Sequence, residues 1–197
     1  LAERMRPRTL DEIVGQEGLL GASGLVRRLQ EGGRLPSLIL HGPPGSGKTT
    51  LGRLLATATG PSFVPFSAVS EGVPRLREIV RAAEERQRTG RRTLLFVDEI
   101  HRLNKGQQDF LLPFLESNEV HPTGETHPVH VDLRAIAATN ADLDSLVADG
   151  RFRADLMFRL RVIPLFLPPL RARVGDVALL AEKILEGNVE GVLKAAQ

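Results

Sequence analysis

Residues 42–49, GPPGSGKT, have the residue types and the spacing of a phosphate-binding loop. The glycines allow a tight turn whose backbone N–H groups face an anion, and Lys48 adds a positive charge that reaches the β- and γ-phosphates of a nucleotide. The hydroxyl group of Thr49 is a suitable ligand for Mg²⁺. The pattern predicts nucleotide binding through Gly42, Pro43, Pro44, Gly45, Ser46, Gly47, Lys48, Thr49 and Thr50.

Two further groups of polar residues follow apolar runs. Asp98 and Glu99 end the run LLFVDE, and Thr139 and Asn140 end AATN. In a parallel sheet such strand ends meet the ligand, so we expect Asp98 to orient the Mg²⁺ shell and Glu99 to polarise the attacking water. Thr139 and Asn140 are candidates to hydrogen-bond the γ-phosphate or that water. The alternatives are solvated caps for the carboxylates and a simple turn residue for Asn140.

Three arginines, Arg151, Arg153 and Arg159, lie among apolar residues in GRFRADLMFRL. They are candidates for a solvated surface, a nucleic-acid patch or catalytic groups. A guanidinium near packed surface needs an anion as its partner. Phosphoryl transfer provides one, because charge spreads over the γ-phosphate oxygens in the transition state.

The elements that position these residues are readable from hydrophobic periodicity. Buried strands are expected at 37–41, 62–69, 92–99, 133–138 and 161–167, and helices at 49–59, 74–90 and 104–117. Pro113 should kink or divide the last helix. Alternating residues around PTGE predict a hairpin at 118–131. Apolar strands that alternate with helices predict an α/β fold with a five-stranded parallel sheet sandwiched between helices.

The composition of the chain excludes several kinds of site and of protein. The 197 residues carry a net charge of +2, and they include no cysteine, which excludes disulfides and thiolate metal sites. No apolar run reaches the roughly 20 residues that span a bilayer. The first residues, LAERMRPRTLDE, lack the apolar core of a secretory signal. We therefore expect a cytoplasmic protein with no membrane partner.

With these motifs the chain resembles the AAA+ ATPases, and it resembles two branches of them. Residues 1–118, with GPPGSGKTTLGRLLA and RRTLLFVDEIHRLNKGQQDFLLPFLE, are similar to the replication-associated recombination (RarA, or MgsA) ATPases, relatives of the Werner-helicase-interacting protein. Residues 119–182, with AATNADLDSLVADGRFRADLMFRLRVIPLFLPPLRARVGDVALLAE, resemble the NtrC-type activators of sigma-54 RNA polymerase. Together the two resemblances suggest a chimera.

The resemblance implies a P-loop AAA+ core over residues 1–170 and a remnant of a truncated C-terminal helical lid over 171–197. It implies ATP or ADP and Mg²⁺ as ligands, and hydrolysis in a homo-oligomeric ring. Asn140 would be the sensor 1 residue, and Arg153 and Arg159 would act on the ATP of a neighbouring subunit. The stretch expected near adenine is Ile13, Val14, Gly15 and Gln16.

The chain also departs from both families. Only SEGVPRLREIVRAAEERQRTGRR separates the second strand from Asp98, so the GAFTGA loop with which the activators engage sigma-54 is missing. Glu190 occupies the position of the sensor 2 arginine. We therefore expect a RarA-like ATPase that acts on DNA. The alternatives are a sigma-54 activator, against which the missing loop argues, and an engineered or truncated nucleotide-binding scaffold with little turnover.

Overall fold

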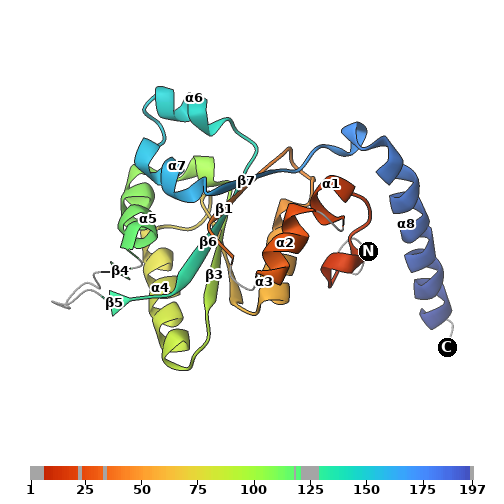
Figure 1. Ribbon diagram of the computed structural model, residues 1–197, viewed down its shortest axis with the longest axis horizontal. Helices are drawn as coiled ribbons and strands as arrows, with labels where there is room; N and C mark the ends of the chain where they lie inside the picture. The colour runs from red at the N-terminus through yellow and green to blue at the C-terminus, as the bar shows by residue number, and fades with distance from the viewer. Residues whose placement is uncertain (1–6, 22–23, 33–34, 118, 121–128, 196–197) are drawn as a thin grey trace.

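The sheet is the centre of the computed structural model, which describes residues 7–21, 24–32, 35–117, 119–120 and 129–195. All strand pairs of this sheet are parallel, and the order is β2-β3-β6-β1-β7 (Figure 1). The strands are β1 (Leu38–His41), β2 (Ser62–Ser67), β3 (Thr93–Asp98), β6 (Leu133–Thr139) and β7 (Ile163–Phe166). The expected α/β fold with five parallel strands is confirmed.

Helices cover both faces of the sheet (Figure 1). One face packs against η1 (Leu10–Glu12), α1 (Glu17–Leu20), α2 (Leu25–Glu31) and α3 (Lys48–Thr59), and the other against α4 (Val73–Arg88), α5 (Lys105–Ser117), α6 (Leu143–Ala148) and α7 (Ala154–Leu160). Along β3 the side chains alternate, so that Leu94 and Phe96 join the first core while Leu95 and Val97 join the second. This alternation explains why nearly every residue of the central strands is apolar.

Several element boundaries differ from the sequence prediction. The helix α5 (Lys105–Ser117) runs through Pro113 without being divided, so of the two effects expected of this proline, a kink or a division, the division is wrong. The helices α6 and α7 were not predicted. The short strands β4 (Glu119–Val120) and β5 (Val129–His130) pair antiparallel where a hairpin was expected, and residues 121–128 of that hairpin lie outside the described residues.

Both edge strands of the sheet contain a proline. Pro65 of β2 lies opposite Phe96 of β3, and Pro164 of β7 lies opposite Ile39 of β1. Proline has no N–H to donate, so it is tolerated at an edge, where a strand needs partners on only one side. The parallel register continues on both sides of each proline.

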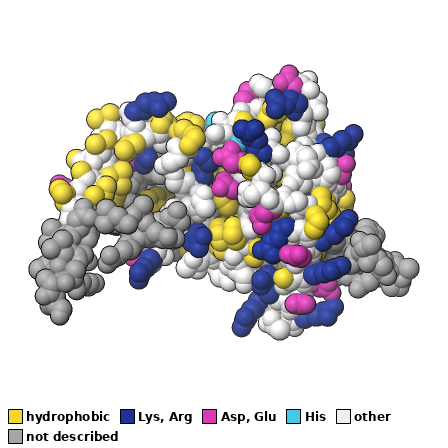
Figure 2. Space-filling view, turned by 180° about the vertical axis from the view of Figure 1, so that it is seen from behind, with side chains coloured by type: hydrophobic (Ala, Val, Ile, Leu, Met, Phe, Trp, Pro, Cys, Tyr) yellow, Lys and Arg dark blue, Asp and Glu magenta, His cyan; other side chains and the backbone are white. Residues whose placement is uncertain are grey.

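The last helix, α8 (Val174–Ala195), follows η3 (Leu170–Ala172) and lies beside α1 and the N-terminal segment rather than on the sheet (Figure 1). Lys183 Nζ donates a hydrogen bond to Glu12 O at 2.5 Å, which ties the helix to that segment. Hydrophobic side chains gather over this helix at the left of Figure 2; the exposed ones include Val174, Val177, Leu179, Ile184 and Leu185. None of the described helices is long and apolar enough to cross a membrane.

Candidate functional site

The loop at residues 42–49 connects β1 to α3 and is shaped by its glycines. Gly45 and Gly47 have φ angles of 75° and 97°, a left-handed conformation that glycine adopts without a steric penalty. A Cβ atom on Gly42 would overlap the carbonyl oxygen of Leu167. The hydroxyl of Ser46 is buried and has no hydrogen-bond partner among the described residues. The loop therefore holds a compact turn with polar groups available to a ligand.

Lys48, the first residue of α3, is almost fully buried at the base of this loop. Its Nζ donates hydrogen bonds to Gly42 O at 2.8 Å and to Pro43 O at 2.9 Å. Burial lowers the pKa of Lys48, while the charges of Glu99 and Asp98 oppose that shift. The structure thus brings the lysine and both predicted carboxylates together at one edge of the sheet, where they are electrostatically coupled.

The two carboxylates occupy a strained turn. Asp98 is the last residue of β3, and Glu99 follows it in the left-handed region at φ 52°. Its backbone N–H donates to Asp98 Oδ1 at 3.2 Å. A non-glycine residue in this conformation costs about 1–2 kcal/mol, and such strain is common at functional sites. The turn leads directly into η2 (Ile100–Arg102).

His101, in η2, lies between Glu99 and the end of β6. Its Nε2 is 3.3 Å from Glu99 Oε2, and its Nδ1 is 3.0 Å from Thr139 Oγ1. Burial lowers the pKa of His101, and the positive charges of Arg102 and Arg151 act in the same direction. Sequence reasoning missed this residue, although its place two positions after Glu99 in DEIH was visible.

The end of β6 lies between β3 and β1 in the sheet order. Thr139 O accepts a hydrogen bond from Gly42 N at 3.1 Å, which joins this strand end to the phosphate-binding loop. Thr139 is fully buried, and Asn140 directly after it is exposed. Because β6 and β3 are neighbours, Asn140 and the carboxylates of β3 share the carboxyl edge of the sheet.

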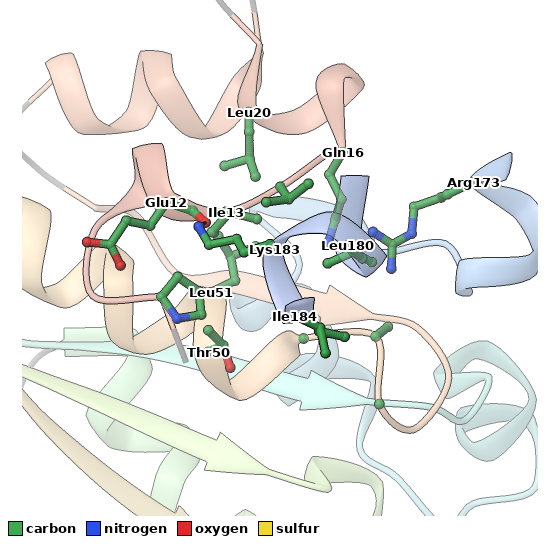
Figure 3. A pocket seen from close by; sticks show the side chains of 15 residues that line it. Glu12, Ile13, Gln16, Leu20, Thr50, Leu51, Arg173, Leu180, Lys183 and Ile184 are labelled. Carbon is green, nitrogen blue, oxygen red and sulfur yellow. Dashed lines mark hydrogen bonds between the residues drawn. The ribbon is translucent and has the colours of Figure 1, made fainter. Parts of the chain in front are cut away.

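A cavity of about 570 Å³ lies between the N-terminal segment, the loop and α8 (Figure 3). The predicted residues Ile13, Val14 and Gln16 line it together with Gly45, Ser46, Gly47 and Thr50. Its remaining lining includes Leu20, Leu51, Leu180 and Ile184, which are apolar, and the cations Arg173 and Lys183. The cavity thus has apolar walls and reaches the turn of the loop, a combination typical of small-molecule sites.

A partly buried ion pair lies beside this cavity, and its arginine, Arg173, is one of the lining residues. Arg173 Nη1 donates to Asp176 Oδ2 at 3.0 Å, and the same oxygen accepts Gln16 N at 3.0 Å. A Cβ atom on Gly15 would overlap the Asp176 carboxyl group, so glycine is required there. Arg173 Nε and Gln16 Oε1 are buried without a hydrogen-bond partner among the described residues. These two atoms are therefore available to a molecule in the cavity.

The three arginines of residues 150–160 are exposed, and so is Phe158, while Phe152, Leu156 and Leu160 are buried in the core. Arg153 Nη2 and Nε bind Asp155 at 2.7 and 3.0 Å, and its Nη1 binds Asp109 at 2.6 Å. These carboxylates, Asp155 first, raise the pKa of Arg153. Arg159 Nε lies 3.9 Å from Glu116. Neither Arg153 nor Arg159 lines the cavity.

A glutamine holds the arginine segment in place. Gln108 of α5 is buried, and its Nε2 donates to Leu103 O at 2.9 Å and to Arg151 O at 3.1 Å. Its Oε1 accepts Arg153 N at 2.9 Å. The backbone that presents Arg153 is thus fixed to the core, although the guanidinium itself lies at the surface.

The residues present fit a magnesium ion. Thr49 follows Lys48 in the first turn of α3, and Asp98 acts electrostatically on Lys48, so an oxygen ligand set of one hydroxyl and one carboxylate lies near the loop. Mg²⁺ is commonly bound by one or two carboxylates together with substrate phosphates. The described residues contain no cluster of three or more His, Asp or Glu side chains that would hold a metal by themselves.

The chain is similar to proteins of two kinds. Residues 82–166 match the sigma-54 interaction domain. The chain is 46% identical over 126 residues to the replication-associated recombination protein A of Escherichia coli K12, which covers 64% of this chain and 28% of that protein. It is 35% identical over 205 residues to the Nif-specific regulatory protein of Sinorhizobium fredii, which covers 93% of this chain and 33% of that protein.

Among solved structures, NtrX from Brucella abortus in complex with ADP superposes with a TM-score of 0.72 at 26% identity, over 94% of this chain and 44% of that one. The similarity to the Nif-specific regulatory protein and to NtrX thus covers more of the chain than residues 119–182. The chain spans about a third or less of the length of the two curated relatives.

Proposed function

Because the chain has the AAA+ fold and resembles both of these branches of AAA+ proteins, we propose that it binds ATP and hydrolyses it with Mg²⁺. The observation that carries this proposal is the cavity in which Ile13, Val14 and Gln16 meet the turn of the phosphate-binding loop. Its apolar part suits adenine, and the loop suits the triphosphate. The relative NtrX was solved with ADP, which supports the choice of an adenine nucleotide.

In the proposed reaction, a water oxygen forms a bond to the γ-phosphorus while the bond to the β–γ bridging oxygen breaks, and ADP leaves. Glu99 takes the proton of the attacking water. Lys48 balances charge on the β- and γ-phosphates, and Asn140 holds the γ-phosphate or the water. Magnesium, when bound through Thr49 and Asp98, supplies further charge neutralisation of the phosphates.

Phosphate release by the wild type and by Glu99→Gln tests this proposal. The amide can still hold a water molecule but cannot accept its proton, so we expect ATP affinity to persist and turnover to fall by about 10² or more. Turnover equal to that of the wild type would remove Glu99 from the reaction. ATP binding without turnover in the wild type would instead favour a nucleotide-binding scaffold.

We further propose a RarA-like role on DNA, in the cytoplasm, performed by a ring of this chain with residues 171–197 forming part of a helical lid. The similarity to the Escherichia coli recombination protein supports this assignment. Hydrolysis with and without forked DNA, measured together with mass in solution at saturating ATP, tests both parts. Stimulation by forked DNA and a mass above that of the monomer are expected.

A sigma-54 activator is the second candidate, because residues 82–166 match the sigma-54 interaction domain. Against it, α4 is one continuous helix between β2 and β3, and every residue from 62 to 98 is described, so no loop is inserted there. Binding of sigma-54 RNA polymerase in the presence of ATP would favour this candidate over the DNA role. We expect no such binding.

A further inference from the structure

We propose that His101 is a positioning residue that holds Glu99 through a directed hydrogen-bond chain from the end of β6. The inference rests on the proposed hydrolysis, in which Glu99 takes the proton of water. It adds a residue that touches neither nucleotide nor water and that acts through the carboxylate. It also joins Glu99 to the strand end that presents Asn140.

The hydrogen-bond chain joins four residues, Ala141, Thr139, His101 and Glu99, and each contact between them is within or near hydrogen-bond distance. Ala141 N donates to Thr139 Oγ1 at 3.0 Å. Thr139 Oγ1 and His101 Nδ1 are 3.0 Å apart, and His101 Nε2 lies 3.3 Å from Glu99 Oε2. Thr139 is fully buried, and the His101 side chain is only 11% exposed, so solvent competes little for these contacts.

The direction of the chain follows from the donors and acceptors. Ala141 N–H donates to Thr139 Oγ1, and the hydroxyl proton has two acceptors within reach, of which His101 Nδ1 at 3.0 Å is nearer than Ala141 O at 3.4 Å. Then Nδ1 is an acceptor and Nε2 carries the proton that points at Glu99. The opposite tautomer would place the Nε2 lone pair against a carboxylate oxygen, which is repulsive. Burial lowers the pKa of His101, which favours this neutral form near pH 7.

The consequence for Glu99 is a fixed orientation. One oxygen, Oε2, is held by His101, and Oε1 remains for the attacking water. Glu99 needs this support because its own backbone is in a strained left-handed conformation and its side chain is one-third exposed. A carboxylate without a lateral partner samples several rotamers, and misplacement of a catalytic group lowers the rate without changing substrate affinity.

Steady-state hydrolysis by matched variants tests the proposal. His101→Leu removes both ring nitrogens at similar volume, and we expect kcat to fall about tenfold while KM for ATP changes little. His101→Gln keeps an N–H near the position of Nε2 and should recover most of that loss. Thr139→Val should lower kcat and Thr139→Ser should restore it, because only the hydroxyl differs in the contact to His101.

The double variant His101→Leu/Thr139→Val should lose no more activity than His101→Leu, since the two residues act along one path. If the kcat losses of the two single variants multiplied in the double variant, the two residues would act independently, and the proposed hydrogen-bond chain would be wrong. A kcat for His101→Leu equal to that of an active wild type would also contradict it. A wild type without turnover would instead count against the proposed function. The hydrogen-bond chain would then be tested by the tautomer of His101 alone.

The tautomer gives a readout that does not depend on activity. In two-bond ¹H–¹⁵N spectra of the full chain, His101 should show the pattern of a neutral ring protonated at Nε2. Thr139→Val should shift the Nδ1 resonance, because the hydroxyl donor is lost, while Glu99→Gln should shift Nε2. A ring protonated at Nδ1 in the wild type would overturn the proposed direction of the chain.

Discussion

Among the described residues, Lys48 Nζ donates its hydrogen bonds to two backbone carbonyls of its own loop. We expect Lys48→Ala to weaken ATP binding by roughly a hundredfold or more, because the N-terminus of α3 alone cannot offset the charge of a triphosphate. Isothermal titration calorimetry measures this directly. The matched control is Lys105→Ala, the same change at an exposed lysine of α5, which should leave affinity unchanged. Equal affinity for Lys48→Ala would refute the phosphate-binding assignment.

His101 also predicts how stability depends on pH. Burial and the charges of Arg102, Arg151 and Lys48 lower its pKa from the ordinary value of 6.5, although Glu99 opposes the shift. Between the folded and the ordinary pKa of His101 the unfolded chain binds more protons at this residue. The contribution of His101 to the free energy of unfolding is therefore constant above pH 6.5 and decreases as the pH falls below that value.

Thermal unfolding between pH 7.5 and 5 checks this dependence. We expect a smaller decrease for His101→Gln, which has no titrating group at this position, and equal slopes in the two proteins would contradict the buried, neutral histidine.

Site residues that belong to a short sequence motif could be predicted. Site residues that depend on contacts between distant parts of the sequence could not. The loop at 42–49 and the pair Asp98 and Glu99 stand in short, dense patterns beside apolar runs. Arg173 lines the cavity, and Asp176 binds Gln16 N, a residue 160 positions earlier in the sequence, through the packing of α8 on the N-terminal segment. The hydrophobic periodicity of a single sequence does not predict a contact between residues so far apart. Asp176 is therefore visible as a partner of Gln16 only in the structure.

At the scale of elements, α3 and β3 are joined by a contact that only glycine permits. A Cβ atom on Gly52 would lie 2.6 Å from ring atoms of Phe96, which is fully buried. Alanine favours a helix by about 1 kcal/mol over glycine, but overpacking a core costs about 1–3 kcal/mol. We expect Gly52→Ala to lower the free energy of unfolding by about 1 kcal/mol, measured by urea denaturation.

Gly175→Ala is the control for that change. Gly175 lies in the first turn of α8, and no heavy atom lies within 4 Å of the position of its Cβ. The higher helix propensity of alanine is not offset by a steric clash there, so this variant should be at least as stable as the wild type. If both variants gained stability, the close approach of α3 to β3 would not limit the residue at position 52.

The elements themselves were predicted unevenly. All five strands of the sheet were expected because they are apolar runs bounded by turn residues. The helices α6 and α7 contain six and seven residues, too short for a clear helical period, and α7 depends on tertiary packing of Leu156 and Leu160. Pro113 lies on the exposed side of α5, so the helix passes through it despite the lost hydrogen bond.

At the scale of the whole molecule, Arg153 and Arg159 lie outside the cavity, which fits a role in a neighbouring copy. We expect Arg153→Ala to bind ATP normally and to hydrolyse it about 10³-fold more slowly. A mixture with Lys48→Ala should recover some activity, because a composite site pairs an intact loop with an intact arginine from the other chain. Phosphate release by the mixture measures this recovery.

Arg161→Ala provides the control, since Arg161 is also exposed and pairs with Asp144 through two hydrogen bonds. Its loss should leave hydrolysis unchanged. An inactive mixture, under conditions where mixed oligomers form, would mean that Arg153 is structural or acts within its own chain. Loss of ATP affinity by monomeric Arg153→Ala would lead to the same conclusion.

The two edge prolines, Pro65 and Pro164, limit how copies of this molecule can associate through the edges of the sheet. A sheet that ends in an unblocked strand recruits foreign strands, which is how many proteins form amyloid-like polymers. Here an incoming strand meets a pyrrolidine ring on β2 or on β7 instead of a hydrogen-bond donor. Pairing of copies through the backbone of β2 or β7 is thereby disfavoured, whereas contacts between side chains, which can dissociate and re-form, are unaffected.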